Sequence, residues 1–190
     1  MSTASRSVPA TAEDPAIHAP ARLAELARLR LATADDDDVL RALARTAAER
    51  LAAPTALINV VYDDAVGVLS AHGLDGWIHE AGGVPIEWSF CRYPVAQGTV
   101  FAVGDLAQNP TTQDNPLVTI DGVRTYAGAP LVTARGERVG ALCVLGGEPR
   151  RFSDADLVAL RALADAVVRY LEARAATADA ARGSAPHRVA

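Results

Sequence analysis

The sequence contains no lysine, and all 18 of its basic residues are arginine. This absence excludes chemistry that depends on a lysine amine, such as Schiff-base formation with a carbonyl substrate. It also excludes binding motifs in which a lysine is required. The use of arginine throughout is typical of a GC-rich genome and says nothing about mechanism.

Cysteine is almost absent as well. The two cysteines, Cys91 and Cys143, lie far apart in the sequence. Their spacing matches neither a disulfide framework nor the short-range cysteine pairs of a metal site. We therefore expect a reducing compartment, the cytoplasm, and no bound metal.

Long apolar runs are missing too. None approaches the roughly 18 residues that a membrane-spanning helix needs, and the N-terminus has no apolar stretch resembling a signal peptide. The net charge of −5 gives no electrostatic attraction to phosphate backbones or anionic membrane surfaces. We expect neither nucleic acid nor a membrane among the partners.

The composition that remains is that of a globular domain. Half of the 190 residues are apolar and 22% are charged, which suits one domain with a sizeable core. Residues 1–20 and 176–190 are rich in small residues and proline and lack periodicity, so we predict two flexible ends. The folded domain is predicted over residues 21–175.

Apolar residues spaced by three and four predict three main helices. The first covers residues 21–32, and the second ends near Leu51. Four acidic residues at 35–38 precede the second helix, where they complement its dipole, although such a run also resembles a cation site. Ser153 begins the third helix, whose apolar stripe contains Leu157, Leu160, Ala164, Val167 and Leu171.

The rest of the domain has the composition of strands and turns. Strands are predicted at residues 57–62, 66–71, 100–103, 126–132 and 138–145. The glycine-containing segment 72–87 is predicted as a long loop, Ser89 as the cap of a short helix reaching Ala96, and residues 105–118 as irregular. Strands segregated from helices indicate an α+β fold with one antiparallel sheet carrying helices.

A series of short motifs follows in order along this domain. They are SFCRY at 89–93, Asp105, NPLV at 115–118, RTYAGAPL at 124–131, GALCVL at 140–145 and RFS at 151–153. The series resembles GAF domains, in particular the bacterial subgroup found in two-component and cyclic-dinucleotide signalling proteins. The resemblance covers about residues 22–172, which is nearly all of the predicted domain.

The resemblance implies a central antiparallel sheet with the N- and C-terminal helices on one face. A ligand pocket would lie on the other face, roofed by the short helix near Cys91 and the irregular segment 105–120. A polar, irregular segment above an apolar sheet face is the usual make-up of a small-molecule site. GAF domains bind varied ligands or none, so the fold names no ligand and no cofactor.

The residues expected to line the pocket come from these motifs. They are Trp88, Phe90, Cys91, Tyr93, Asp105, Arg124 and Tyr126. The aromatic residues form either a cage around a ligand or a part of the core. Arg124 either holds an anionic ligand bidentately or pairs with one of the acids Asp105, Asp114 and Asp121.

The two cysteines receive different interpretations. Cys91 lies in the first turn of the predicted short helix, where free N–H groups and Arg92 favour the thiolate, so it is a candidate for sensing oxidants or anchoring a ligand. The alternative is a small buried hydrophobic residue between Phe90 and Tyr93. Cys143 lies inside an apolar strand and is interpreted as structural.

Specific activities of GAF domains find little support. Bilin attachment commonly uses a Cys followed by His, whereas Cys91 is followed by Arg92, and cyclic-nucleotide binding in phosphodiesterases uses a motif with lysine. Haem would need an axial ligand, for which His72 and His79 are candidates, although either is also an ordinary surface histidine. Free-methionine sulfoxide reductases need a set of exchanging cysteines that this sequence does not match.

We therefore expect a sensory or regulatory module that binds a small molecule or senses redox state and signals in trans to a partner protein. The last helix and helix 21–32 are expected to form a homodimer seam, or else their apolar stripe packs on the sheet. One alternative function is an enzyme using Cys91 in thiol redox chemistry, but no His–Asp–Cys constellation supports catalysis. Another is an interaction module with a degenerate pocket.

Overall fold

The computed structural model describes residues 14–31 and 37–183. Most of the predicted flexible N-terminal segment, the end of the C-terminal tail, and Asp35 and Asp36 of the acidic run lie outside these ranges. The strands are β1 (Thr55–Val61), β2 (Ala65–His72), β3 (Gly83–Pro85), β4 (Phe101–Val103), β5 (Thr125–Val132) and β6 (Arg138–Gly146). The helices are α1 (Pro20–Leu29), α2 (Asp38–Arg50), α3 (Gly76–Ala81), α4 (Arg92–Gln97), α5 (Pro116–Thr119) and α6 (Asp154–Gly183).

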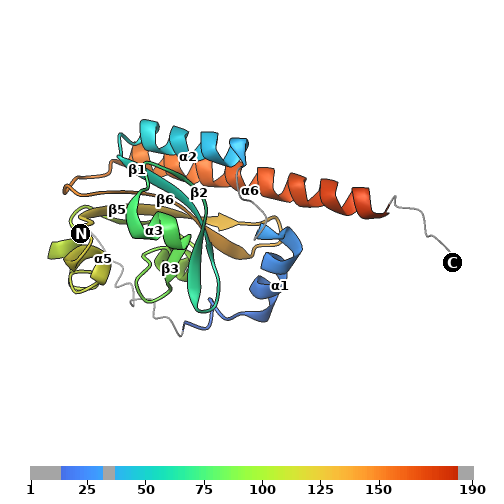
Figure 1. Cartoon of the computed structure of the whole chain (residues 1–190), viewed down its shortest axis with the longest axis horizontal. Coiled ribbons are helices and arrows are strands. Elements are labelled where there is room, and N and C mark those ends of the chain that lie inside the picture. Colours follow the sequence, from blue (N-terminus) through green and yellow to red (C-terminus); the bar gives the residue numbers. More distant parts are fainter. Residues whose placement is uncertain (1–13, 32–36, 184–190) are drawn as a thin grey trace, which may run out of the picture.

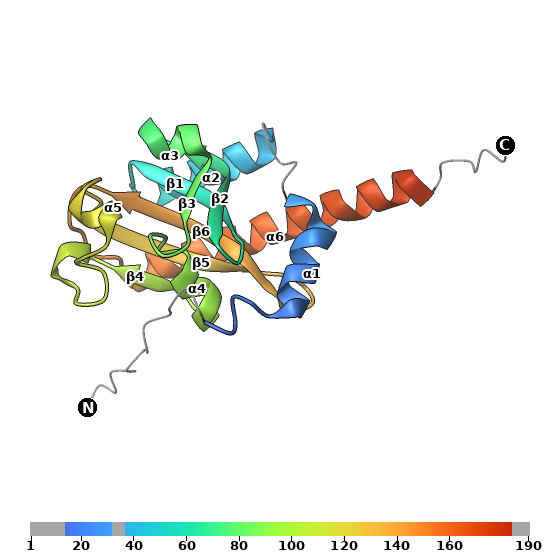
Figure 2. The same cartoon turned by 60° about the horizontal axis from the view of Figure 1, so that its bottom comes forward.

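The strands form one six-stranded antiparallel sheet in the order β3-β2-β1-β6-β5-β4. Helices α2 and α6 run side by side along one face of this sheet, and α3 and α5 lie on the other (Figure 1). Figure 2 turns this second face toward the viewer and shows that it also carries α4. The α+β fold with terminal helices on one face is confirmed.

Side chains of the central strands alternate between two cores because successive residues of a strand point to opposite faces. In β1, Ile58 and Val60 join the core beneath α1, α2 and α6. Leu57 and Val61 join a second core beneath α3 and α4. The whole of β1 is buried, so the sheet is covered on both faces.

The helix N-termini are capped as the sequence predicts. Asp37 accepts hydrogen bonds from the backbone N–H groups of Val39 (3.0 Å) and Leu40 (3.2 Å) at the start of α2. At the start of α6, the Ser153 hydroxyl accepts a bond from the backbone N–H of Asp156 (3.2 Å), and the Asp156 carboxylate accepts one from the backbone N–H of Ser153 (2.8 Å). Asp37 is thus a helix cap, as expected from the dipole of α2.

Two segments differ from the prediction. The predicted loop 72–87 contains α3 and β3, because Gly76 and Gly82, both with φ of +67°, delimit a short helix instead of marking irregular chain. Helix α6 continues to Gly183, beyond the boundary that the sequence placed at residue 175.

The apolar stripe of α6 packs on the sheet. Leu160, Ala164, Val167 and Leu171 are buried in the core that α6 shares with α2 and the sheet. The same helix turns Val158 outward with 69% of its surface exposed. The stripe is therefore used within one chain, and a dimer would have to use other residues of α6.

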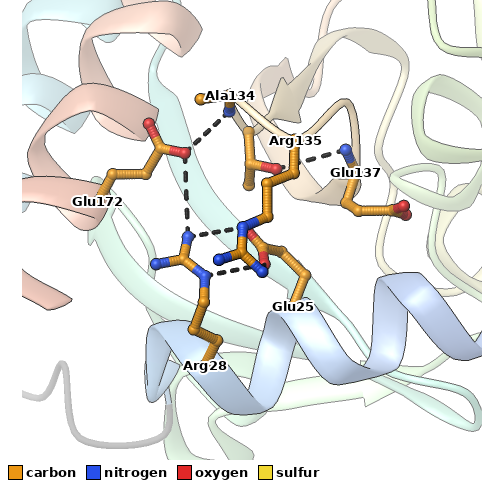
Figure 3. Close-up of polar contacts among 7 residues, drawn as sticks. Glu25, Arg28, Ala134, Arg135, Glu137 and Glu172 are labelled. Atoms are coloured by element: carbon orange, nitrogen blue, oxygen red, sulfur yellow. Dashed lines mark hydrogen bonds and ion pairs between the residues drawn. The ribbon is translucent and has the colours of Figure 1, made fainter. Parts of the chain in front are cut away.

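A buried carboxylate links α1 to the β5–β6 turn and to α6 (Figure 3). Glu25 accepts hydrogen bonds from Nε and Nη2 of Arg28 at 2.8 and 2.7 Å, and Arg135 lies 3.8 Å away. Arg28 also lies 3.9 Å from Glu172, which accepts a bond from the backbone N–H of Ala134 (2.8 Å). These contacts place the charged side chains of α1 beside the β5–β6 turn and α6.

This network makes stability depend on pH. Hydrogen bonding from Arg28 lowers the pKa of Glu25 despite burial of the carboxyl. A lowered pKa means stabilisation that is present above the pKa of the unfolded chain, about 4.3, and lost as pH falls through the folded value. We expect the free energy of unfolding of the wild type to exceed that of Glu25→Gln at pH 7, and we expect this difference to shrink as the pH falls below about 4.3. Urea unfolding at several pH values measures this difference in free energy, and a difference that does not depend on pH would contradict this role for Glu25.

Candidate functional site

A cavity lies between the second face of the sheet and its covering segments. It holds about 520 Å³ of space not filled by protein atoms, part of it open to solvent. Its floor consists of Leu57, Asn59, Tyr126, Cys143 and Leu145 from the three central strands. Its walls and roof include Leu74, Ile78, Val84, Phe90, Cys91, Leu117 and Val123. The lining is therefore mainly apolar, as in many small-molecule sites.

The polar part of the cavity is a group of side chains around two thiols. The Sγ atoms of Cys91 and Cys143 lie 3.7 Å apart. Asn59 Nδ2 donates to Cys91 Sγ at 3.1 Å and to Cys143 Sγ at 3.4 Å. The Tyr126 hydroxyl donates to Cys91 Sγ at 3.4 Å. We call Asn59, Cys91, Tyr126 and Cys143 the thiol cluster.

The register of the sheet explains how the thiol cluster forms. Leu57 pairs with Cys143 across β1 and β6, so Asn59, two residues along, points to the same face as Cys143. Cys91 immediately precedes α4, with its backbone N–H bonded to the Ser89 hydroxyl at 3.1 Å. This turn brings the Cys91 thiol down onto the floor. Ser89 thus satisfies an N–H just before α4, rather than inside the helix as predicted.

Tyr126 reaches the thiols because of a glycine. Gly128 follows two residues later on the same face of β5, and a Cβ there would lie 2.2 Å from the Tyr126 hydroxyl oxygen. The missing side chain gives the phenol ring room to lie along the strand. The hydroxyl can therefore contact Cys91 while the ring remains buried.

Asn59 has an unused hydrogen-bond acceptor. Only 3% of the residue is exposed, and its Oδ1 atom has no hydrogen-bond partner among the described residues. The pairing of β1 with β2 shifts register between Ile58 and Asn59, a bulge that interrupts the ladder beside this residue. A buried acceptor left unpaired costs free energy unless something supplies a donor.

The two thiols have opposite electrostatic environments. Hydrogen bonding from Cys143, supplemented by Tyr126 and Asn59 and opposed by burial, lowers the pKa of Cys91 to about 7. The contact with Cys91, together with burial, raises the pKa of Cys143. The pKa of Tyr126 is raised by burial and by the neighbouring thiols, so the phenol stays protonated and can donate. Cys91 is thus the thiol that ionises first.

The structure separates the aromatic residues proposed from the sequence. Phe90 and Tyr126 line the cavity together with Cys91. Tyr93 instead stacks on Phe101 with ring centroids 4.6 Å apart, inside the core beneath α4. Trp88 packs edge-on against Trp77 at 5.9 Å, outside the group of residues that line the cavity.

Arg124 pairs with Asp105. Its Nε and Nη2 atoms donate to the carboxylate at 3.0–3.2 Å, and the same carboxylate accepts a bond from the backbone N–H of Ala107. Of the two interpretations of Arg124, the structure shows the ion pair. This pair fastens the irregular segment to the start of β5, and neither residue lines the cavity.

The described lining of the cavity includes neither His72 nor His79. His72 ends β2 and His79 lies on α3. Across residues 14–31 and 37–183, no group of three or more His, Cys, Asp or Glu side chains is placed to hold a metal ion. None of the helices in that part of the chain combines the length and apolar character needed to cross a membrane.

Sequence reasoning missed Asn59 and treated Cys143 as structural alone. A signal for Asn59 was present, because it is an amide in the middle of an otherwise apolar strand, where a polar side chain needs a partner. The approach of Cys143 to Cys91 had no local signal, since it depends on the pairing of β1 with β6 and on where α4 begins.

Comparison with known proteins gives the following similarities. A family model described as GAF domain matches residues 33–172. A cyclic di-GMP phosphodiesterase of Pseudomonas aeruginosa, PA2567, is 35% identical over 130 residues, which are 68% of this chain and 21% of that protein. The chain thus spans about a fifth of the length of this relative.

Solved structures of low sequence identity share the fold. The blue-light absorbing form of the PixJ GAF domain from Thermosynechococcus elongatus superposes with a TM-score of 0.60 at 20% identity, covering 90% of this chain and 98% of that one. A type II free methionine-R-sulfoxide reductase from Thermoplasma acidophilum gives a TM-score of 0.58 at 14% identity, covering 70% and 89%. These likenesses concern architecture and carry no ligand or activity to this chain.

Proposed function

The chain belongs to the GAF domain family, and from this premise we propose that it is a regulatory module whose cavity binds a small, largely apolar molecule carrying one hydrogen-bond donor. The observation that carries the proposal is Oδ1 of Asn59. It is a buried acceptor without a partner among the described residues, and its side chain lines an apolar cavity. A ligand hydroxyl or N–H placed there would satisfy it.

Phenol and toluene provide a matched pair of probes, because they have nearly the same shape and only phenol has a donor. We expect the wild type to bind phenol in the cavity and the Asn59→Leu variant to lose the preference for phenol over toluene. The change in the ratio of the two affinities should be about tenfold, the equivalent of one hydrogen bond of roughly 1.4 kcal/mol. Ligand-observed NMR or calorimetry measures both affinities.

The double comparison separates the hydrogen bond from general hydrophobicity. Toluene binding should change little in Asn59→Leu, since leucine fills a similar volume and toluene has no donor for the Oδ1 acceptor that is removed. If neither probe binds the wild type at saturating concentration, the ligand proposal fails. An interaction module with a filled pocket would then be the better interpretation.

The position of the cavity suggests how binding is transmitted. The sheet that forms its floor also forms the surface on which α2 and α6 pack. Helix α1 packs on the same core, and its Glu25 and Arg28 face Arg135 of the β5–β6 turn and Glu172 of α6. A ligand that favours one arrangement of the floor shifts the population of helix arrangements. We propose that α1 and α6 pass this change to a partner in trans or to a second copy of the chain.

An enzymatic role for Cys91 is the second candidate. Cys91 has a lowered pKa and neighbouring donors, which favour a reactive thiol. No histidine lies among the described residues of the thiol cluster or the cavity lining, so the arrangement suits thiol oxidation better than acyl transfer or hydrolysis.

A further inference from the structure

We propose that Cys91 and Cys143 form an intramolecular disulfide when a hydroperoxide enters the cavity. This disulfide is a property separate from ligand binding. It rests on the proposed function only in that both use the same cavity. A redox signal and a ligand would then act on one set of residues, the thiol cluster.

The geometry of the two sulfurs carries the inference. At 3.7 Å they are in van der Waals contact, although Cys91 follows the β3–α4 turn and Cys143 lies in the central strand β6. A disulfide bond is about 2.05 Å long, so the sulfurs need to approach by about 1.7 Å. The turn before α4 is the part that has to move, because β6 is hydrogen-bonded to strands on both sides.

The cavity gives the oxidant its route. Both cysteines are buried from the outer surface, yet both line the cavity, part of which is open to solvent. Hydrogen peroxide is little larger than water and can follow this path. Donors from Tyr126 and Asn59 at 3.1–3.4 Å stabilise negative charge on Cys91, the thiol expected to react first.

Two steps complete the reaction. The Cys91 thiolate attacks one oxygen of the peroxide, an S–O bond forms as the O–O bond breaks, and the leaving oxygen takes up a proton to become water or an alcohol. Sulfur is oxidised to a sulfenic acid and the peroxide is reduced. Cys143 Sγ then attacks Cys91 Sγ, the S–S bond forms, and hydroxide leaves with the Cys143 proton as water.

The disulfide changes the ligand site. Asn59 Nδ2 and the Tyr126 hydroxyl lose their thiolate acceptor, and the turn carrying Ser89 and Phe90 moves toward the floor. Both changes alter the wall and the polar end of the cavity. Oxidation is therefore expected to weaken phenol binding several-fold.

Intact-mass spectrometry of the full chain tests the proposal. Treatment with a small excess of hydrogen peroxide, followed by denaturation and alkylation, should yield monomer lighter by two hydrogens and closed to alkylation. Peptide mapping should join Cys91 to Cys143. Dithiothreitol should restore both free thiols.

Two single variants assign the steps. In Cys143→Ala, Cys91 should stop at the sulfenic acid and be trapped by dimedone, whereas Cys91→Ala should form no intramolecular bond. Two free thiols in oxidant-treated wild type would overturn the proposal, as would disulfides found only between chains. Both of these overturning results are measured on the wild type, so they remain valid even if a variant folds poorly.

The ligand proposal and the disulfide proposal can be refuted independently of each other. Reduced protein that binds phenol but keeps two free thiols after peroxide would refute the disulfide and leave the proposed function intact. Protein that forms the disulfide but, when reduced, binds neither phenol nor toluene would refute the proposed function and leave the disulfide intact.

Discussion

Replacing Leu160 by glutamate is expected to unfold the domain instead of dissociating a dimer. Leu160 is fully buried where α6 packs on the sheet. Losing a buried leucine costs about 2 to 5 kcal/mol, and an unpaired buried carboxylate adds to it. The total approaches the roughly 5 to 15 kcal/mol that stabilises an ordinary domain. Circular dichroism and thermal unfolding measure the loss.

Val158→Glu is the matched control, because it places the same charge on the same helix at a position that is 69% exposed. We expect its free energy of unfolding to stay within about 0.5 kcal/mol of the wild type. A folded monomer for Leu160→Glu beside a dimeric wild type would contradict the observed packing of α6. If the outward face of α6 carries a dimer seam, Val158→Glu should reduce the mass measured by light scattering without unfolding the chain.

Arg22→Met is expected to destabilise the domain by about 3 kcal/mol. Arg22 is only 1% exposed and donates to the carbonyl oxygens of Ile17 at 2.6 Å and Val61 at 2.5 Å. Methionine can fill the aliphatic volume, but it leaves both buried acceptors without a donor. Urea unfolding followed by tryptophan fluorescence reports the change.

The effect should be strongest in the segment before α1. Ile17 is buried in the core on the cavity side, and Arg22 ties it to the end of β1. Hydrogen exchange in residues 14–29 should accelerate more than in β6. Arg135→Met is the control, because Arg135 is mostly exposed and its ion pair at 3.8 Å contributes little. Equal losses in the two variants would rule out the hydrogen bonds as the cause.

Local patterns in the sequence were sufficient for most of the fold. The strands β5 and β6 were predicted from β-branched and apolar runs, and the start of α6 from Ser153 and Asp156. Helix α3 was not predicted because glycines such as Gly76 and Gly82 are typical of loops. At positive φ they instead delimit a single short helix. Composition does not distinguish a glycine that ends a helix from one that prevents it.

The candidate site depended more on long-range geometry. Phe90, Cys91 and Tyr126 were identified through motifs, and the cavity includes all three. The partner of Arg124 could not be chosen from the sequence, since several acids were equally available and only the path of the chain before β5 brings Asp105 close. The thiol cluster likewise depends on strand register, which no short segment specifies.

The alternation of side chains along β1 has a consequence for divergence within the family. Leu57, Asn59 and Val61 face the cavity side, while Ala56, Ile58 and Val60 face the helices. Substitutions at the first set of positions therefore change the lining on the cavity side, and substitutions at the second set change the packing against the helices. Under the proposed function, related chains can differ in ligand preference through the first set while the second set keeps the same architecture.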